Sequence, residues 1–289
     1  MKRVLVTGGT GFVGRNSMPL LQEKFEIVAP RRSDVNLLDP AEFRRFAENQ
    51  GFDVLLHLAN PNPAKNDLDS SDRMFEDSMR AFSSVYSCVD LCEKIIYLGS
   101  GAEMDKRLDM HLIKEDSFGR SFPVDAYGKA KYLQNQIARR DDSVVNLRLF
   151  ACYGPWDHWS KFITHCIRSV IAGKPITIRQ DCIFDYLHVY DLARVLCWAI
   201  DGHQEHSDYN VSTGKEISLS EIAAMVLDEM GSNLNVDIKD DGWNKSYSAS
   251  NERLSNEMGV VDTIDIRQGI KMQIAHETDV YPIGGYEQL

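Results

Sequence analysis

The sequence predicts an α/β fold in which a doubly wound parallel sheet is covered by helices on both faces. Short apolar, β-branched runs alternate with segments of helical length through the first 150 residues, and the first run ends in a glycine-rich turn. The chain has 289 residues, 43% of them hydrophobic, which is enough for a sizeable core. Strand–helix–strand alternation favours a parallel sheet because parallel neighbours need crossover connections.

Five buried strands are expected because their runs are brief, β-branched and bounded by polar residues or glycine. They are KRVLVTG (2–8), FEIVAP (25–30), DVLLHLA (53–59), KIIYLGS (94–100) and VVNLRLF (144–150). The segments of helical length between them are 12–23, 40–50, 71–93 and 125–140. The second helix has a clear start signal: Asp39 is an N-cap residue, Pro40 suits the first helical position, and Glu42 lies in the first turn.

The alternation becomes irregular after residue 150. Segment 160–173 is predicted to be helical, 175–178 extended, and 184–200 a strand followed by a helix. A further helix is expected after Ser218, because Ser218 and Glu221 form a capping-box pattern ahead of an apolar run. The second lobe is therefore expected to arise from C-terminal excursions of the chain and not from an independent unit.

Composition and charge argue against several classes of protein. The formal net charge is −11, whereas nucleic-acid binding needs clustered Lys and Arg, so no nucleic-acid partner is expected. The N-terminal apolar run is short for a secretory signal and no segment has the length of a membrane span, which predicts a cytoplasmic protein without membrane contact. The six cysteines have no metal-ligand spacing, so we expect reduced thiols and no metal site.

The glycine-rich turn lies between the first strand and the first helix. Its glycines fit G-x-G-x-x-G from Gly9 and also G-x-x-G-x-x-G from Gly8. Such glycines permit a tight turn and let backbone N–H groups approach a pyrophosphate at the helix N-terminus. The predicted cofactor contacts in this turn are Gly8, Gly11, Phe12, Val13 and Gly14. The position of the turn after a strand and before a helix favours a dinucleotide site.

The end of the second strand indicates which dinucleotide binds. A carboxylate there would hydrogen-bond the ribose 2′-hydroxyl of NAD, whereas arginine would pair with the 2′-phosphate of NADP. Arg31 and Arg32 stand at this point, and the first acidic residue is Asp34. Because guanidinium groups bind phosphate through bidentate, charge-assisted hydrogen bonds, NADP(H) is favoured. Asp34 keeps NAD(H) open.

A tyrosine and a lysine at helical spacing form a candidate acid–base pair. Tyr127 and Lys131 are four residues apart, which places them on the same face of the helix expected over 125–140. A free phenol has a pKa of about 10, and a nearby ammonium lowers it towards neutral pH. A tyrosine in this setting can give or take the proton of a carbinol while a nicotinamide carries hydride.

These motifs together resemble the extended short-chain dehydrogenase/reductase family. The resemblance rests on the glycine-rich turn, HLAN (57–60), Ser100, the Tyr127–Lys131 pair, RLFACYGP (148–155) and FDYLHVYDLARVL (184–196), and it covers residues 1 to about 230. It implies a Rossmann-type cofactor domain, a smaller C-terminal substrate-binding lobe and a nucleotide-diphosphate sugar as substrate. The expected cofactor domain is 1–150 with 184–212 returning to it, and the expected substrate lobe is 151–183 with 213–289.

The resemblance also implies roles for individual residues. Ser100 matches the catalytic Ser/Thr, Tyr127 the acid–base group, and Lys131 its partner, which also holds the nicotinamide ribose. Other positions match residues that line the cofactor, namely Asn36 and Leu37 beside the adenine and Leu58, Ala59 and Asn60 after the third strand. Paired long helices of the family commonly form a homodimer, which is the expected assembly.

Departures from the family pattern sort the possible reactions. The 4,6-dehydratases carry an Asp-Glu pair directly after the catalytic Thr, but Gly101 and Ala102 follow Ser100 here and Glu103 is one place out of register. GDP-fucose synthases use a Cys where Gly101 stands. Arg31-Arg32 and DVNLLD (34–39), which resembles a segment of the 4-keto-sugar reductases, favour reduction at C4. A 4-epimerase with tightly bound NAD stays open.

The substrate side departs further from the family. Ala151 stands where many relatives have a substrate-binding Asn, and Phe184 where many have the Arg that binds pyrophosphate. Lys161 and Arg179 are the nearest positive candidates for substrate phosphates, with Ser100 at the sugar. These departures leave open a dehydrogenase for a small non-nucleotide alcohol or ketone. A non-catalytic NADP(H) sensor is a further alternative, which the presence of Ser100, Tyr127 and Lys131 disfavours.

Overall fold

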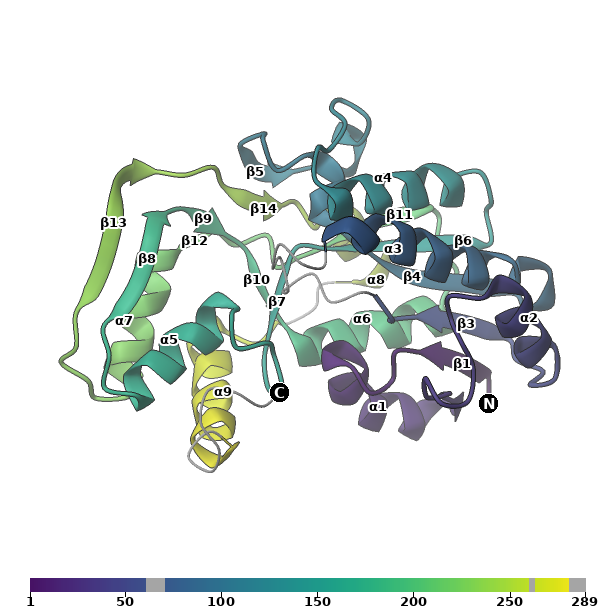
Figure 1. Ribbon diagram of the computed structural model, residues 1–289, viewed down its shortest axis with the longest axis horizontal. Coiled ribbons are helices and arrows are strands. Elements are labelled where there is room, and N and C mark those ends of the chain that lie inside the picture. Colours follow the sequence, from purple (N-terminus) through teal and green to yellow (C-terminus); the bar gives the residue numbers. More distant parts are fainter. Residues whose placement is uncertain (61–70, 260–262, 281–289) are drawn as a thin grey trace.

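The computed structural model describes residues 1–60, 71–259 and 263–280, and its centre is a six-stranded parallel sheet. The strand order is β2-β1-β3-β4-β6-β11 (Figure 1). The strands are β1 (Arg3–Thr7), β2 (Glu26–Val28), β3 (Val54–His57), β4 (Lys94–Ser100), β6 (Val144–Leu149) and β11 (Asp208–Val211). The order reverses beside β1, so the carboxyl ends of β1 and β3 form the switch point at which ligands bind in such folds. The structure confirms the α/β fold.

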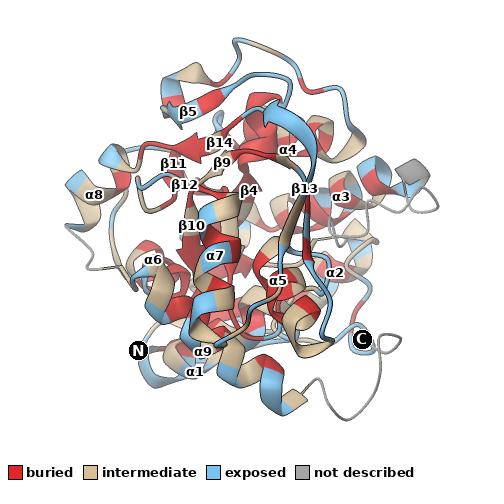
Figure 2. Cartoon of the chain, turned by 90° about the vertical axis from the view of Figure 1, so that its left-hand side faces the viewer, coloured by how far each residue is buried: buried red, intermediate tan, exposed pale blue. Residues whose placement is uncertain are grey.

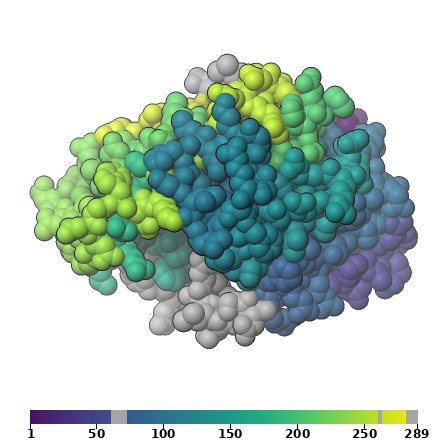
Figure 3. Space-filling view, turned by 90° about the horizontal axis from the view of Figure 1, so that it is seen from above, coloured from purple at the N-terminus to yellow at the C-terminus, as the bar shows by residue number. Residues whose placement is uncertain are grey.

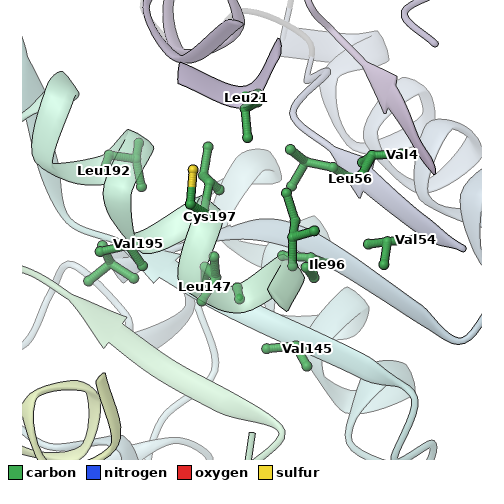
Figure 4. Packing of buried hydrophobic residues seen from close by; sticks show 14 of the residues in the cluster. Val4, Leu21, Val54, Leu56, Ile96, Val145, Leu147, Leu192, Val195 and Cys197 are labelled. Atoms are coloured by element: carbon green, nitrogen blue, oxygen red, sulfur yellow. The ribbon is translucent and has the colours of Figure 1, made fainter. Parts of the chain in front are cut away.

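Helices cover both faces of this sheet, as Figure 1 shows. One face carries α1 (Phe12–Lys24) and α6 (Val189–Asp201), and the other carries α2 (Pro40–Glu48), α3 (Ser71–Tyr86) and α4 (Ala126–Ala138). Strand residues alternate between the two layers: Leu56 packs with Leu21 and Leu192, whereas Leu55 packs with Phe43 and Phe82. Figure 4 shows the first layer, where Val4, Leu56 and Ile96 of the strands point towards the helices.

The smaller lobe has its own core. It contains α5 (Phe162–Ile171), α7 (Leu219–Glu229) and α9 (Ile266–Val280), which pack on the parallel pair β8 (Ile176–Asp181) and β13 (Val236–Trp243). Figure 2 shows that most of β13 is exposed. A four-stranded sheet of order β12-β9-β14-β5 adjoins it, built from β12 (Ile217–Ser218), β9 (Ile183–Phe184), β14 (Tyr247–Ala249) and β5 (Met110–Ile113). The remaining strands, β7 (Ala151–Tyr153) and β10 (Tyr186–His188), pair in parallel, and α8 (Glu252–Met258) follows β14.

Local signals in the sequence agree with the helix starts. Asp39 accepts hydrogen bonds from the backbone N–H groups of Ala41 and Glu42. Ser218 and Glu221 form the reciprocal bonds of a capping box at α7. The expected helix over 71–93 is shorter, because α3 ends at Tyr86 and a separate 3₁₀ turn, Val89–Leu91, follows. The expected strand 175–178 extends to Asp181 because β13 pairs along its length.

No helix of the described residues combines the length and apolar character needed to cross a bilayer. All six cysteines are free thiols, and four of them are buried. Among the described residues, one cluster has metal-ligand geometry, formed by Glu205, His206 and Glu257. The Glu257 carboxylate already accepts hydrogen bonds from Tyr209 and from the backbone of Glu205, so we assign no metal to it.

Candidate active site

The glycine-rich turn has the geometry of a pyrophosphate cradle. Gly8 has a φ of +76°, and a Cβ atom there would lie 2.5 Å from the backbone nitrogen of Ala59. Gly14 packs against the same turn, since a Cβ atom there would lie 2.3 Å from the carbonyl oxygen of Gly8. Gly11 is the N-cap of α1, so the next three N–H groups have no partner within the helix. The structure favours the spacing from Gly8, and these N–H groups are the donors that a phosphate needs.

The loop after β2 presents two exposed arginines. Arg31 and Arg32 form no ion pair with any described residue. Asp34 folds back on the loop, where its carboxylate accepts hydrogen bonds from the Arg31 N–H (2.7 Å) and the Ser33 hydroxyl (3.1 Å). The bond from the Arg31 backbone lowers the pKa of Asp34. Asn36 closes the same loop through its side chain, which accepts from the Leu38 N–H at 3.0 Å.

Leu58 and Ala59 continue β3 beside the glycine-rich turn. The N–H of Leu58 donates to the carbonyl of Thr7, and Ala59 contacts Gly8. Asn60 ends the described part of this loop. Leu37 lies on the other side of the sheet, partly buried against the core that includes Val35 and Phe43.

Ser100 is the last residue of β4 and the N-cap of a 3₁₀ helix, Gly101–Met104. Its Oγ accepts from the Ala102 N–H at 3.2 Å, and its own N–H donates to Glu103 at 2.9 Å. The side chain is buried and interacts with the phenol of Tyr127. The turn chemistry of GSGAE therefore holds Ser100 at the carboxyl end of β4, facing the first turn of α4.

A glycine lets α4 approach Ser100 closely. A Cβ atom on Gly128 would lie 2.9 Å from the carbonyl oxygen of Ala102 and 2.8 Å from Pro123. Asp125 caps the helix by accepting from the Gly128 N–H at 2.8 Å. Burial raises the pKa of Tyr127 to about 12, and the hydrogen bond with Ser100 acts against this rise. The structure thus brings Tyr127 and Ser100 together from separate elements.

Lys131 lies one turn further along the same face of α4. Its Nζ donates to the carbonyl oxygen of Leu98 at 2.8 Å and lies 5.9 Å from the centroid of the Tyr127 ring. Burial lowers the pKa of Lys131 to about 8. Its charge also contributes to the lowered pKa of His57, which is about 3 mainly because His57 is buried.

Glu103 points away from Ser100 Oγ, into a buried polar network. Its carboxylate accepts from Arg148 Nε at 3.0 Å and from the amides of Asn135 and Asn146 at 3.1 Å each. Arg148 also binds Asp208 at 2.6 Å, and both charged partners of this pair are buried. With the Ser100 N–H included, four donors hydrogen-bond this carboxylate, and both of its oxygens accept. Glu103 therefore holds the strand ends together and has no free oxygen for a substrate.

An aromatic wall that the sequence analysis missed adjoins Ser100. Tyr247, on β14, packs against Phe150 at 5.1 Å and Phe184 at 5.6 Å between ring centroids. A Cβ atom on Gly101 would lie 2.5 Å from the Tyr247 hydroxyl. In the view of Figure 3, the surface of residues around 105–125 adjoins that of the segment before β14, and the Met110 N–H bonds the carbonyl of Ser246. No local signal marks Tyr247, because β14 is only three residues long.

The predicted phosphate-binding residues lie in the smaller lobe. Lys161 is exposed at the N-cap of α5, and its charge acts on Asp157, whose pKa burial raises to about 7. Arg179 is 92% exposed on β8 and pairs with Asp240 of β13 at 3.5 Å. Lys106 was not predicted, yet its Nζ lies 5.7 Å from the Tyr127 ring centroid. Of these three cations, Lys106 is the one with a contact to the Ser100–Tyr127 pair.

The fold, with its glycine-rich turn between β1 and α1, is that of a dinucleotide-dependent enzyme, and Ser100, Tyr127 and Lys131 stay its predicted catalytic residues. A family model, the NAD dependent epimerase/dehydratase family, matches residues 4–212. The chain belongs to this family, whose members are NAD(P)-dependent enzymes that modify nucleotide sugars. The resemblance stated from the motifs is thereby confirmed.

Individual relatives are distant. The chain is 25% identical over 274 residues to an ADP-L-glycero-D-manno-heptose-6-epimerase of Pseudomonas paraeruginosa, covering 78% of each chain. It is 24% identical over 253 residues to a GDP-L-fucose synthase of Azorhizobium caulinodans, covering 80% of this chain and 81% of that one. The fold is similar to that of UDP-glucose 4-epimerase from Thermotoga maritima, with a TM-score of 0.83, 16% identity and coverage of 96% and 99%. A GDP-mannoheptose C4 reductase from Campylobacter jejuni gives a TM-score of 0.83 at 15% identity, with coverage of 96% and 98%.

Proposed function

We propose that this protein is an NADPH-dependent reductase of the C4 keto group of a nucleotide-diphosphate sugar. The proposal rests on the contacts of Gly101 and Glu103, two of the residues that follow Ser100 in the chain. Glu103 is fully engaged with Arg148 and its neighbours, so it is no acid or base for removing water. Gly101 has no space for a side chain, since its Cβ would lie 2.5 Å from Tyr247 and 2.6 Å from Phe150, so a Cys does not fit there.

The remaining proton-handling groups of this centre suit simple redox chemistry at a carbinol carbon. Tyr127 protonates the substrate oxygen, Ser100 donates a hydrogen bond to the same oxygen, and Lys131 favours the tyrosinate that forms. The nicotinamide, when bound, supplies hydride to the keto carbon. Lys131 is held by Leu98 so that its charge faces the Tyr127 ring.

The cofactor proposed is NADP(H). Two features support it over NAD(H): the exposed side chains of Arg31 and Arg32, and the engagement of the Asp34 carboxylate with its own loop. Arginine binds a 2′-phosphate through charge-assisted hydrogen bonds, while a carboxylate that is already bonded is a poorer acceptor for a ribose hydroxyl. Solved structures of similar fold contain either cofactor, NADP in the C4 reductase and NAD in a UDP-glucose 4-epimerase of Thermus thermophilus.

A 4-epimerase is the second candidate, because Ser100, Tyr127 and Lys131 also suffice to oxidise C4 and reduce it again. An epimerase retains its cofactor through the cycle, whereas a reductase exchanges it. The two functions therefore differ in what co-purifies with the protein. On the substrate side, we propose that Lys161 and Arg179, with Lys106 nearer the centre, supply positive charge for the diphosphate. A homodimer is proposed for the assembly.

The test begins with the cofactor content of freshly purified protein, followed by NADPH oxidation with a panel of UDP-, GDP-, dTDP- and CDP-linked 4-keto sugars. We expect an empty site, rapid binding of NADPH and stoichiometric oxidation with at least one sugar. Tightly bound NAD and interconversion of 4-hydroxy sugars would establish the epimerase. No thermal shift with any nucleotide sugar would contradict both functions.

The cofactor proposal has a separate test. Arg31→Ala with Arg32→Ala should weaken NADPH binding at least tenfold and leave NADH binding within about twofold, because only NADPH has the 2′-phosphate. Lys24→Ala, which removes an exposed cation at the far end of α1, is the matched control. Equal losses for NADPH and NADH in the double variant would contradict the assignment.

A further inference from the structure

The Ser100 side chain interacts with two tyrosines that come from separate parts of the fold. Tyr127 belongs to α4 of the cofactor domain, and Tyr247 belongs to β14 of the four-stranded sheet. The Ser100 side chain interacts with both phenols, and the Tyr247 hydroxyl lies only 2.5 Å from the place that a Cβ atom of the adjacent Gly101 would take. Tyr247 is held there from three sides, by Phe150, by Phe184 and by its backbone pairing with Phe184 and Met110.

The limited number of hydrogen bonds that a serine hydroxyl can make determines which way the hydrogen of Ser100 points. A hydroxyl has one hydrogen to donate and two lone pairs that accept. The Ala102 N–H already donates to Ser100 Oγ at 3.2 Å. If Tyr247 fills the second lone pair, the hydrogen of Ser100 is left to point towards Tyr127 and towards a substrate oxygen placed beside it.

We infer that Tyr247 is a positioning residue that donates to Ser100 Oγ and thereby makes Ser100 a hydrogen-bond donor to the substrate carbonyl. The phenol of Tyr247 is a donor at neutral pH, because burial raises its pKa. Gly101 is the neighbour that allows the approach, since any side chain there would collide with the Tyr247 hydroxyl. The smaller lobe thus supplies one group of the catalytic centre.

This inference rests on the proposed function, because it concerns the oxygen that Tyr127 and Ser100 serve. Its first test is a double-mutant cycle with NADPH and a 4-keto sugar that the panel assay identifies as a substrate. Tyr247→Phe keeps the ring packing and should lower kcat about tenfold, the cost of about one hydrogen bond, with KM and NADPH affinity within about twofold. In the Ser100→Ala background, Tyr247→Phe should change kcat less than twofold, since it acts through Ser100.

The matched control is Tyr132→Phe, which removes the hydroxyl of a tyrosine on α4 whose ring packs on Phe118 and Phe122. It should retain wild-type kcat. An unchanged kcat in Tyr247→Phe, or an equal loss in the Ser100→Ala background, would overturn the inference. A loss confined to KM would place Tyr247 in substrate binding instead and would also overturn it.

A second readout needs no substrate and separates this inference from the proposed function. The phenolate absorbance of Tyr127 in the NADP⁺-bound protein is identified by its loss in Tyr127→Phe. The Ser100 hydrogen bond lowers the pKa of Tyr127, so Tyr247→Phe should move this titration to higher pH, towards that of Ser100→Ala. An unmoved titration refutes the role of Tyr247, whereas a moved titration in a protein that reduces no nucleotide sugar refutes only the proposed function.

Discussion

Removing the Glu103 carboxylate tests whether this residue is structural or catalytic. Glu103→Ala takes away the acceptor of the Arg148 Nε–H, of two amide groups and of the Ser100 N–H. Arg148 is wholly buried and would keep Asp208 and the amide oxygen of Asn210 as its partners. Breaking a buried ion pair by deleting one partner costs about 3–5 kcal/mol. In Glu103→Ala the Arg148 Nε–H, two side-chain amides and the Ser100 N–H would all lose their acceptor, although Asp208 still balances the charge of Arg148.

The expected loss is large enough to measure by thermal unfolding. For chains of roughly this size, 1 kcal/mol corresponds to about 2–4 °C in the midpoint, so Glu103→Ala should lower the midpoint by about 10 °C. The control is Glu48→Ala, which removes the partner of Arg44 on the surface of α2 at a pair distance of 3.0 Å. A surface pair of this kind contributes about 0.3–0.5 kcal/mol, so the control should move the midpoint by about 2 °C or less.

Two results would contradict a structural role for Glu103. A wild-type midpoint for Glu103→Ala would show that the network does not stabilise the fold. Glu103→Gln has the shape of the native residue, and a variant that unfolds at the wild-type temperature yet loses all turnover would show that Glu103 handles a proton. That outcome would return dehydration to consideration and would contradict the proposed reduction.

Three further predictions concern the acid–base group, the buried histidine and the glycine turn. Tyr127→Phe should reduce turnover by at least 1000-fold while NADPH binding, followed by nicotinamide fluorescence, stays within about twofold; an unchanged rate would refute its role. Burial lowers the pKa of His57 to about 3, so the folded state binds fewer protons than the unfolded state between pH 3 and about 6.5 and stability falls as pH falls through that range, by up to about 1.4 kcal/mol per pH unit. His57→Asn should flatten this fall in pH-dependent denaturant unfolding, and an identical slope would contradict the assignment. Gly8→Ala should abolish measurable cofactor binding and destabilise the fold by about 1–3 kcal/mol, because its φ is +76° and its Cβ would collide with Ala59; wild-type binding would refute the cradle.

Much of the cofactor half could be predicted because its signals are local. The five predicted strands all pair in the central sheet, and the start of α2 follows from Asp39 and its first turn. β11 escaped prediction because DYNV is short and half polar, and its burial depends on pairing with β6 and on the packing of Tyr209 and Val211 in the core. The end of α3 at Tyr86 was also missed, since the apolar pattern continues into the 3₁₀ turn that follows.

The sequence predicted some residues of the candidate site but not how their side chains are arranged. Ser100, Tyr127 and Lys131 were expected from a combination of motifs, and the structure brings the first turn of α4, which carries Tyr127, close to the turn that follows Ser100. The predicted cofactor residues, those of the glycine-rich turn included, stay predictions, as do Lys161 and Arg179 for substrate. The direction of the Glu103 side chain was not predictable, because the spacing from Ser100 fits both a reacting group and a structural one.

The sequence by itself determined the alternation of strands and helices, the helix caps and the glycine turn, since each depends on residues within one strand or one helical turn. Only the tertiary structure decided what surrounds Ser100. Tyr247 arrives there from β14, and Glu103 turns inward to Arg148, because the order of strands and the paths of the loops bring distant segments together. Such contacts depend on packing across the whole molecule, which no local pattern in the chain encodes.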